Sequence, residues 1–419
     1  MAAASSNDAG VRILALTHYY PPEVNAPATR MSEHARAWAA LGHDVTIVTC
    51  APNHPAGKLY PGYRNRLWQE EKIDGVRVIR LWTWLAANAG VVSRFANFIS
   101  YFMSVFFWMW RFPRADVILS TSPQFLCGLA GWLLKRRRRP WVLEIRDIWP
   151  ESIVATGAMR PSVIIRLLEA IEASAYRHAD LVVPVTDGFV PHIREARPDG
   201  PILVLKNGVD LDVFQVADAQ SAATFKAAHG LTGKFVAAYI GTHGMAHGLD
   251  TVLDAAEKLQ HRTDIAFLLV GSGAERTRLE AAAAARGLDN VVMLDQQPKS
   301  EIVAIWSAAG AAMVLLRRSD TFKTVIPSKI FEAMALSRPI ILGVEGEARA
   351  LVEAGGAGLT ITPEDAEALA AAIERLADDP ALAERLGTSG RAFVEREFDR
   401  TRLAATYAAA LQELVDRHR

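Results

Sequence analysis

The most constraining feature of the sequence is a regular alternation of short apolar runs with longer amphipathic stretches. Helix-length stretches such as Pro27–Leu41 and Ser162–His178 separate most of the runs. Strands that alternate with helices are typical of a parallel, doubly wound sheet. The runs form two sets, 11–17, 45–50, 76–82, 116–120, 141–145 and 181–185, then 235–240, 266–270, 291–294, 312–316, 339–342 and 358–361. The sequence therefore predicts an α/β protein with two Rossmann-like halves.

The length of 419 residues exceeds one ordinary hydrophobic core and favours two domains. We expect a first domain over 1–205, an interdomain linker over 206–233 and a second domain over 234–395. A terminal helix over 396–419 has the length to cross back to the first domain. In such folds ligands bind beyond the carboxyl ends of the strands, and in a two-domain version between the halves. Functional side chains are therefore expected in the loops that follow the strands.

Composition and charge limit the class of partner and the compartment. The chain has 46 Lys and Arg against 46 Asp and Glu, so its net charge gives no indication of a nucleic-acid partner. A basic block stands at 135–139. Two cysteines, Cys50 and Cys127, fit buried thiols in a reducing compartment, and residues 1–10 lack the pattern of a secretion signal. We expect a cytoplasmic protein.

One apolar segment, FANFISYFMSVFFWMW at 95–110, raises the question of a membrane. A membrane-spanning helix needs about 20 residues, which is more than this segment has. Asn97, Ser100 and Ser104 recur on one side of it, as in a helix that lies in the membrane interface. The alternative is a core helix of an α/β layer. The basic block at 135–139 favours contact with an anionic leaflet, so we expect a peripheral protein on the inner membrane face.

Two glycine-containing loops follow apolar runs of the second half. The first is GTHGMAHG at 241–248, and the second is Gly271-Ser272-Gly273. Such loops can bring backbone N–H groups against a phosphate at the start of a helix. Glycine is also common in these turns for steric reasons alone. Two loops of this kind in one half favour a nucleotide.

The segment VIPSKIFEAMA at 325–335 places charges in a helix that is otherwise apolar. Pro327 suits the first helical position, and Lys329 lies in the first turn, where the helix dipole disfavours a cation. An anion nearby would explain that lysine. Glu332 follows on the same face and could accept the hydroxyl protons of a ribose. The alternative is an exposed Lys–Glu pair on a surface helix.

This segment carries a family resemblance. Residues 328–335 followed by Arg338-Pro339-Ile340 resemble the nucleotide-sugar motif of glycosyltransferase family 4, a group of retaining enzymes with the GT-B fold. Residues 41–49 and 207–210 resemble other parts of the family pattern, and 144–152 resembles its WbuB-like branch, which builds bacterial surface polysaccharides. The resemblance implies two Rossmann-like domains that face a central cleft. It also implies a nucleoside-diphosphate-sugar donor, with UDP expected, and neither a metal nor another cofactor.

The sequence departs from the family pattern at its donor residues. Thr324 stands where the first of two glutamates is usual, and Thr242 and His247 stand where the family has an Arg and a Lys. Lys329 is then the best remaining cation for a diphosphate. The donor-binding residues that the resemblance implies are Glu332, Ser328, Ile326, Gly241, Thr242, His243, Gly271, Gly273 and Lys206.

The resemblance also suggests catalytic and acceptor-side roles. In the first half Asp147 is the candidate for orienting an acceptor hydroxyl and Arg146 is a candidate catalytic cation, and Lys329 of the second half is the other candidate cation. Asp147 could instead cap the next helix. On the acceptor side we expect His18, Asn25 and Glu151, although His18 could equally be a satisfied loop histidine. Asp210-Leu211-Asp212 is not expected to bind a metal, since two acidic residues alone make a thin magnesium site.

Taken together, these features predict a transferase that moves a sugar from a nucleotide donor to a polyprenyl-diphosphate-linked acceptor at the inner membrane surface. Two other functions stay open. A nucleotide-sugar epimerase of the same fold would need no membrane, and a non-catalytic scaffold of a polysaccharide assembly complex would explain Thr324, Thr242 and His247.

Overall fold

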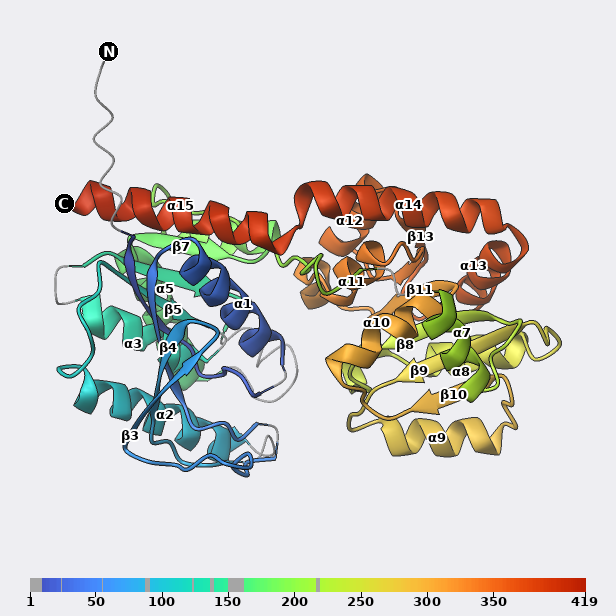
Figure 1. Ribbon diagram of the computed structural model, residues 1–419, viewed down its shortest axis with the longest axis horizontal. Coiled ribbons are helices and arrows are strands. Elements are labelled where there is room, and N and C mark those ends of the chain that lie inside the picture. The colour runs from blue at the N-terminus through green and yellow to red at the C-terminus, as the bar shows by residue number, and fades with distance from the viewer. Residues whose placement is uncertain are drawn as a thin grey trace, which may run out of the picture. The chain divides into compact units, whose positions relative to one another are not determined.

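The chain folds into two compact units, unit 1 (1–206 and 400–419) and unit 2 (207–399). The computed structural model describes residues 10–23, 25–54, 56–86, 91–122, 124–135, 139–149, 162–215 and 219–419 (Figure 1). Each unit is built on its own sheet, with helices on both faces. The predicted α/β class with two Rossmann-like sheets is confirmed.

The sheet of unit 1 has seven strands in the order β3-β4-β2-β1-β5-β6-β7. All neighbours are parallel except β3 and β4, which pair antiparallel. The sequence pattern missed β3, because WQEEKI is a partly exposed edge strand in which charged residues outnumber apolar ones. The strands are β1 (Arg12–Leu16), β2 (Asp44–Cys50), β3 (Trp68–Ile73), β4 (Val76–Leu81), β5 (Val117–Thr121), β6 (Trp141–Ile145) and β7 (Leu181–Pro184).

Both faces of this sheet are covered by helices. Ile13 and Ala15 of β1 face α1 and α15, whereas Leu14 and Leu16 face α2, α3 and α5, as the two-residue period of a strand requires. Trp38 ties α1 to α15 through a 3.0 Å hydrogen bond from its Nε1 to the Ala404 carbonyl. The helices are α1 (Ala26–Ala40), α2 (Val91–Trp108), α3 (Phe125–Lys135), α5 (Val163–His178), α6 (Val190–Ala196) and α15 (Arg400–His418).

Helix α2 turns its polar side inward. The Ser104 hydroxyl donates to the Trp82 carbonyl at 2.7 Å, and the Asn97 amide donates to the Trp84 carbonyl at 2.6 Å. Ser100 accepts a 2.8 Å hydrogen bond from the Trp84 backbone N–H. The three polar residues therefore satisfy the backbone of 82–84 and do not face a water layer. Among the described residues, no helix is long and apolar enough to cross a membrane.

The sheet of unit 2 has six parallel strands in the order β10-β9-β8-β11-β12-β13. They are β8 (Phe235–Ile240), β9 (Ile265–Val270), β10 (Val291–Leu294), β11 (Ala311–Leu315), β12 (Ile340–Gly343) and β13 (Gly358–Thr360). The helices are α7 (Ala219–Ala228), α8 (Asp250–Lys258), α9 (Arg276–Ala285), α10 (Lys299–Ala308), α11 (Lys329–Ala335), α12 (Glu347–Ala354), α13 (Ala366–Asp378) and α14 (Pro380–Glu397).

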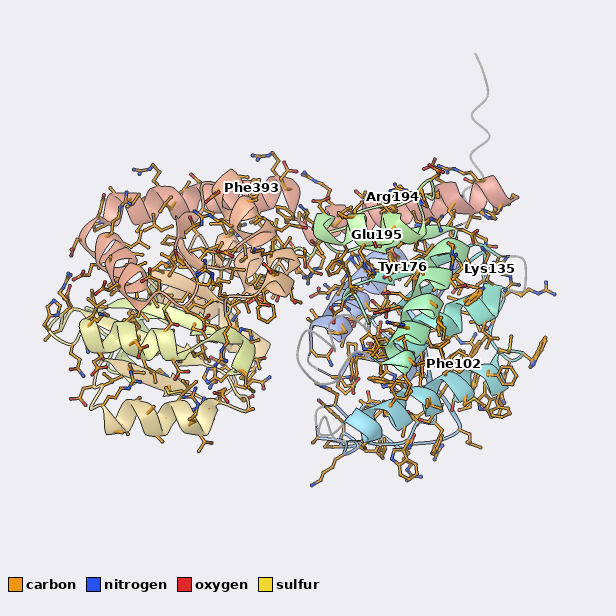
Figure 2. All side chains as sticks on the ribbon, turned by 180° about the vertical axis from the view of Figure 1, so that it is seen from behind. Phe102, Lys135, Tyr176, Arg194, Glu195 and Phe393 are labelled. Carbon is orange, nitrogen blue, oxygen red and sulfur yellow. The ribbon has the colours of Figure 1, made fainter. Side chains whose placement is uncertain are left out.

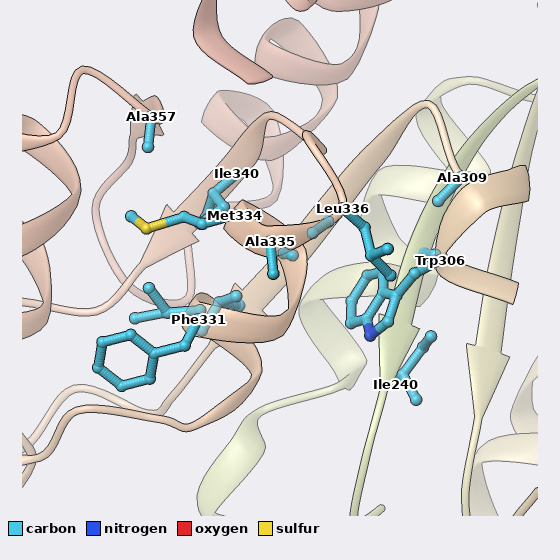
Figure 3. Packing of buried hydrophobic residues seen from close by; sticks show 14 of the residues in the cluster. Ile240, Trp306, Ala309, Phe331, Met334, Ala335, Leu336, Ile340 and Ala357 are labelled. Atoms are coloured by element: carbon cyan, nitrogen blue, oxygen red, sulfur yellow. The ribbon is translucent and has the colours of Figure 1, made fainter. Parts of the chain in front are cut away.

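Helix α11 is fixed on the sheet by its apolar side chains. Phe331, Met334 and Ala335 are fully buried and belong to one core cluster with Trp306 of α10 (Figure 3). The helix begins at Lys329, so the prediction that Pro327 is its first residue is wrong by two positions. Pro327 instead accepts a 3.1 Å backbone hydrogen bond from Ile330. The buried face determines which way Lys329 and Glu332 of the same short helix point.

Candidate functional site

The candidate site of unit 2 lies where the strand order changes direction. The two central strands are β8 and β11. After β8 the chain continues to β9 in one half of the sheet, and after β11 it continues to β12 in the other half. Open α/β sheets bind ligands at such a switch point, beyond the carboxyl ends of the strands. Here β8 leads into Gly241–His247, and the chain that follows β11 leads into α11 with Lys329.

Lys329 and Tyr239 form the centre of this site. The Lys329 Nζ lies 3.6 Å from the centroid of the Tyr239 ring, within the range of a cation–π contact. That nitrogen is buried and has no hydrogen-bond partner among the described residues. Burial lowers the pKa of Lys329 to about 7, and Glu332 offsets part of the effect. An ammonium without a partner in such a place is the electrostatic complement of an anion.

Two histidines surround the same tyrosine. The ring centroids of His243 and His247 each lie 5.9 Å from that of Tyr239. Both nitrogens of His243 and the Nδ1 of His247 are buried without a hydrogen-bond partner in the described parts of the chain. Burial lowers the pKa of each histidine to about 4, so both rings are neutral at pH 7. We call Lys329, His243 and His247 the nitrogen cluster.

The two predicted glycine loops interlock beside the nitrogen cluster. The His243 backbone N–H donates to the Ser272 carbonyl at 2.8 Å. A Cβ at Gly271, which has a φ of +149°, would lie 1.9 Å from the Gly241 carbonyl oxygen. A Cβ at Gly273 would lie 2.3 Å from the His243 carbonyl oxygen. The need for glycine at 271 and 273 is therefore steric, and these contacts hold the His243 loop in place.

Gly241 leaves room for the lysine. A Cβ at this position would lie 2.8 Å from the Lys329 Nζ and 3.9 Å from the Tyr239 hydroxyl. The Tyr239 hydroxyl donates a 2.8 Å hydrogen bond to the Thr242 carbonyl, which fixes the ring under the ammonium. Thr242 itself is exposed. The structure thus places Gly241, His243 and Lys329, together with the backbone of Thr242, around Tyr239.

Other predicted donor residues lie around α11. The Trp306 indole donates to the Glu332 carboxylate at 3.4 Å, which orients that side chain. Ser328 precedes the helix without a side-chain capping bond and is exposed, and Ile326 is half-buried against the core. The Thr324 hydroxyl donates to the Thr321 carbonyl within a short 3-10 helix. That local bond occupies the side chain that stands in place of the family glutamate.

In unit 1 the predicted catalytic pair follows β6. The Arg146 backbone N–H donates to the Ser122 hydroxyl at 2.9 Å, and burial lowers the pKa of the Arg146 guanidinium to about 10. Asp147 lines a mostly apolar pocket together with Phe125, Trp149 and Tyr176. The Phe125 and Trp149 rings stack with centroids 4.8 Å apart. Glu172 lines the same pocket, but its carboxylate accepts a 2.6 Å hydrogen bond from the Tyr176 hydroxyl, so Asp147 is the carboxylate considered for an acceptor.

The remaining acceptor-side predictions have mixed outcomes. His18 is buried against Phe98 and Tyr101 of α2, and burial lowers its pKa to about 4. Asn25 caps α1, since its Oδ1 accepts a 2.9 Å hydrogen bond from the Ala28 N–H. Lys206 pairs with Asp187 at 2.7 Å. Glu151 lies outside the described residues.

The basic block at 135–139 is described only in part. The Lys135 ammonium donates to Asp180 at 2.8 Å and to the His178 carbonyl at 2.7 Å, so this member holds α3 against α5. Residues 136–138 lie outside the described part of the chain. The structure thus gives Lys135 an internal partner in place of the predicted membrane contact.

Sequence reasoning missed two residues of the unit 2 site, Tyr239 and Trp306. Each contacts a predicted residue that lies far away in the chain, so no local motif marks it. The signal for Tyr239 was its hydroxyl, the one polar side-chain group in an otherwise apolar strand, separated from the glycine loop by one residue. Within the described residues, no group of three or more His, Cys, Asp or Glu is placed to hold a metal ion.

Comparison with known proteins gives the family. Residues 25–208 match the description "Glycosyl transferase 4-like domain", and residues 221–393 match "Glycosyl transferases group 1". The chain belongs to the GT-B glycosyltransferases. Of the three functions that the sequence left open, these matches support the transferase. Its assignment to the WbuB-like branch stays a prediction.

One relative supports the glycosyltransferase assignment over most of the chain, and solved structures share the fold. WcaI of Escherichia coli (strain K12), named as a colanic acid biosynthesis glycosyl transferase, is 25% identical over 402 residues, which cover 93% of this chain and 97% of WcaI. Sucrose-phosphate synthase of Thermosynechococcus elongatus has the same fold with a TM-score of 0.76, 21% identity and coverage of 96% and 99%. Anabaena Alr3699/HepE, solved in complex with UDP-glucose, gives a TM-score of 0.71, 16% identity and coverage of 96% and 100%.

Proposed function

We propose that this glycosyltransferase moves a sugar, with retention of configuration, from a UDP-sugar on unit 2 to a polyprenyl-diphosphate-linked acceptor on unit 1. The product would be a lipid-linked intermediate of a bacterial surface polysaccharide. The observation that carries the donor half is the buried ammonium of Lys329, which has no hydrogen-bond partner among the described residues. The name of WcaI supports a polysaccharide product, and the HepE complex supports a UDP-sugar donor.

The nitrogen cluster would bind the donor diphosphate. Breaking the bond between sugar and diphosphate builds negative charge on the leaving phosphate, and a fixed cation in a site with little water stabilises that charge strongly. Lys329 supplies this cation. The neutral rings of His243 and His247 can donate N–H groups to phosphate oxygens without the cost of burying further charge. Glu332, held by the Trp306 indole, would accept hydrogen bonds from the ribose hydroxyls.

Retention would follow from the leaving phosphate acting as the base. In this scheme the acceptor hydroxyl gives its proton to a phosphate oxygen as it bonds to the sugar carbon on the face that the phosphate leaves. No protein base is then required, and Asp147 has the smaller task of orienting the acceptor hydroxyl. Arg146 would stabilise charge on the acceptor side. We expect the reaction to need no metal ion or other cofactor.

The acceptor half of the proposal rests on unit 1. The pocket beside Asp147 is small and lined mainly by apolar and aromatic side chains, which suits contact with one apolar group of a lipid-linked acceptor. Helix α2, which contains most of the segment 95–110, exposes large apolar residues and would place unit 1 on the inner membrane surface. The basic block at 135–139, apart from the paired Lys135, would add positive charge there. An acceptor with a polyprenyl tail has to be reached from that surface.

Two substitutions in unit 2 test the donor half. Transfer from UDP-sugar should fall by a factor of about 10² to 10³ in Lys329→Ala, the size of effect seen when one charge-stabilising group is removed from an active site. Glu332→Ala should raise the donor KM more than it lowers kcat. Lys323→Ala is the matched control, because Lys323 is an exposed lysine of the same region that pairs with Asp320. Unchanged turnover in Lys329→Ala would refute the proposed donor site.

The identity of the donor can be tested without the acceptor. Slow hydrolysis of a panel of UDP-, GDP- and TDP-sugars by the purified full chain, read as release of the nucleoside diphosphate, should be fastest for one UDP-sugar. A preference for another base would overturn the UDP assignment and leave the transferase assignment intact. Interconversion of the donor sugar without release of nucleotide would instead favour an epimerase.

A further inference from the structure

Helix α2 presents an apolar face to the outside of unit 1. Tyr101, Val105 and Met109 are buried on the sheet side, at helical spacing. On the opposite side Phe107 is 66% exposed, and Ile99, Met103 and Phe106 are between 40% and 44% exposed. Trp110, in the turn just after the helix, is 79% exposed. Since the polar residues of α2 bond to 82–84, the helix has apolar side chains on both its buried and its outer face. A helix on the outside of a water-soluble domain normally has a polar outer face.

The start of helix α5 has the same property. Val163, Ile164 and Leu167 are 82%, 61% and 60% exposed. Arg166 is exposed between them, while Ile165 is buried. Helices α2 and α5 cover the same face of the sheet, on either side of α3 (Figure 2). The two sets of exposed apolar side chains therefore belong to one side of unit 1.

Charge separates along the chain in a way that fits this side. Residues 75–143, which include α2 and α3, contain ten Lys and Arg but only one acidic residue, Asp116. That carboxylate is paired with Arg12, with 2.6 Å between nitrogen and oxygen. Three of the ten cations are paired with carboxylates outside this range, Arg77 with Glu70, Arg80 with Glu71 and Lys135 with Asp180, so the positive charge rests on the other seven. A basic region with exposed aromatic side chains is complementary to an anionic lipid surface.

We propose that unit 1 binds an anionic bilayer through two elements together, the outer face of α2 and the first turn of α5. We call these residues, Ile99, Met103, Phe106, Phe107, Trp110, Val163, Ile164 and Leu167, the two-helix surface. The inference deepens the proposed function, because it rests on the location at the membrane and names the contact. A contact through one helix would leave unit 1 free to rotate about the axis of that helix. Contact through two separated helices fixes the tilt of unit 1 on the bilayer.

A bilayer fits this surface better than a second copy of the chain does. Two copies that met through it would bring two basic regions together, and like charges at an interface are unfavourable. Exposed apolar side chains can enter the boundary between headgroups and acyl chains while arginines stay at the level of the phosphates.

Vesicle flotation of the purified full chain tests the proposal. The vesicles contain phosphatidylcholine alone or with about one third phosphatidylglycerol. The paired variants Phe106→Ser/Phe107→Ser in α2 and Ile164→Ser/Leu167→Ser in α5 should each lower partitioning onto the anionic vesicles at least tenfold. Leu41→Ser is the matched control, because Leu41 is 54% exposed at the end of α1, on the opposite face of the sheet, and should change partitioning less than twofold.

Each other outcome contradicts the proposal in a distinct way. Wild-type partitioning in the α5 pair would remove α5 from the contact. Equal binding to neutral vesicles would exclude recognition of anionic lipid. A dimer in sedimentation velocity that either pair dissociates would make the surface a protein interface. Donor hydrolysis and thermal unfolding of the variants should match those of the wild type, so a failure here is separable from a failure of the donor site.

Discussion

The two units differ in what they leave unsatisfied. Thirteen large hydrophobic side chains are exposed among the described residues, and eleven of them belong to unit 1. Unit 2 exposes only Val213 and Met245 among its described residues. Buried side-chain nitrogens without partners occur in both units, but those in the described part of unit 2 belong to Lys329, His243 and His247 and gather around one ring, that of Tyr239. Unit 1 therefore lacks an apolar cover on its outside, and unit 2 lacks an anion in its interior. The difference leads to a different proposed ligand for each unit, a bilayer for unit 1 and a diphosphate for unit 2.

The largest expected effect contrasts two tryptophans of unit 1. Trp38 is fully buried between His34 and Tyr407, whereas Trp110 is 79% exposed. Trp38→Ala should lower the free energy of unfolding by about 3–5 kcal/mol, as for other buried aromatic residues. Trp110→Ala should change it by less than about 0.5 kcal/mol. Urea unfolding without lipid measures both, and a comparable loss in Trp110→Ala would show that the protein itself covers this side chain.

A second contrast concerns two glycines of unit 2. Gly271→Ala would place a Cβ against the Gly241 carbonyl, and Gly287→Ala would place one in open space, although φ is positive at both positions. The substitution at 287 should cost about 1 kcal/mol from backbone strain alone. At 271 we expect roughly 2–4 kcal/mol and a loss of UDP binding, because the loop that carries His243 has to move. Equal losses in chemical denaturation would mean that the loops do not depend on their close contact.

Donor affinity should depend on pH through the nitrogen cluster. The pKa of Lys329 is lowered to about 7 in the empty site, and a bound diphosphate would raise it, so binding takes up a proton above pH 7. The Kd for UDP-glucose should then rise with pH above about 7, by at most tenfold per unit, and stay level between pH 5 and 7. The charged and titratable groups near the cluster are Glu332, Arg276, Glu280 and Tyr239.

Calorimetry at pH 8 in buffers of different ionisation enthalpy measures this uptake, which should approach one proton. Lys329→Arg is the control, because a guanidinium stays protonated and should flatten the pH dependence. A Kd that is constant from pH 6 to 9 in the wild type would mean that Lys329 does not meet the donor charge.

The smallest expected effect concerns Asn25. Its side chain caps α1, so Asn25→Ala should cost about 1 kcal/mol of stability, while Asn25→Asp keeps the cap and should cost much less. Transfer by the folded enzyme should be unchanged in Asn25→Asp. If Asn25→Asp loses transfer while its stability stays normal, the Asn25 amide contacts the acceptor. Polar recognition of substrate would then not be confined to unit 2.

The sequence predicted the parts of this structure that local pattern controls. Buried parallel strands read as short apolar runs, so both sheets were found, whereas the exposed edge strand β3 has no such run. Lys329 stood out because a lysine in the first turn of an apolar helix is costly. Its contact with Tyr239 joins residues 90 positions apart and depends on how α11 sits on the sheet, which no local pattern encodes. Which side of α2 faces the protein could not be predicted for the same reason, because its polar side chains form hydrogen bonds with the backbone of 82–84.

The inward hydrogen bonds of α2 have a mechanical consequence. To enter a bilayer as a separate helix, α2 would have to break its hydrogen bonds to the backbone of 82–84. It would also have to withdraw Tyr101, Val105 and the following residue Met109 from their packing on the sheet. In the proposed bilayer contact, unit 1 would then enter only to about the length of one side chain. Attachment and release would need no refolding, so the enzyme could leave one lipid-linked substrate and reach the next by simple dissociation.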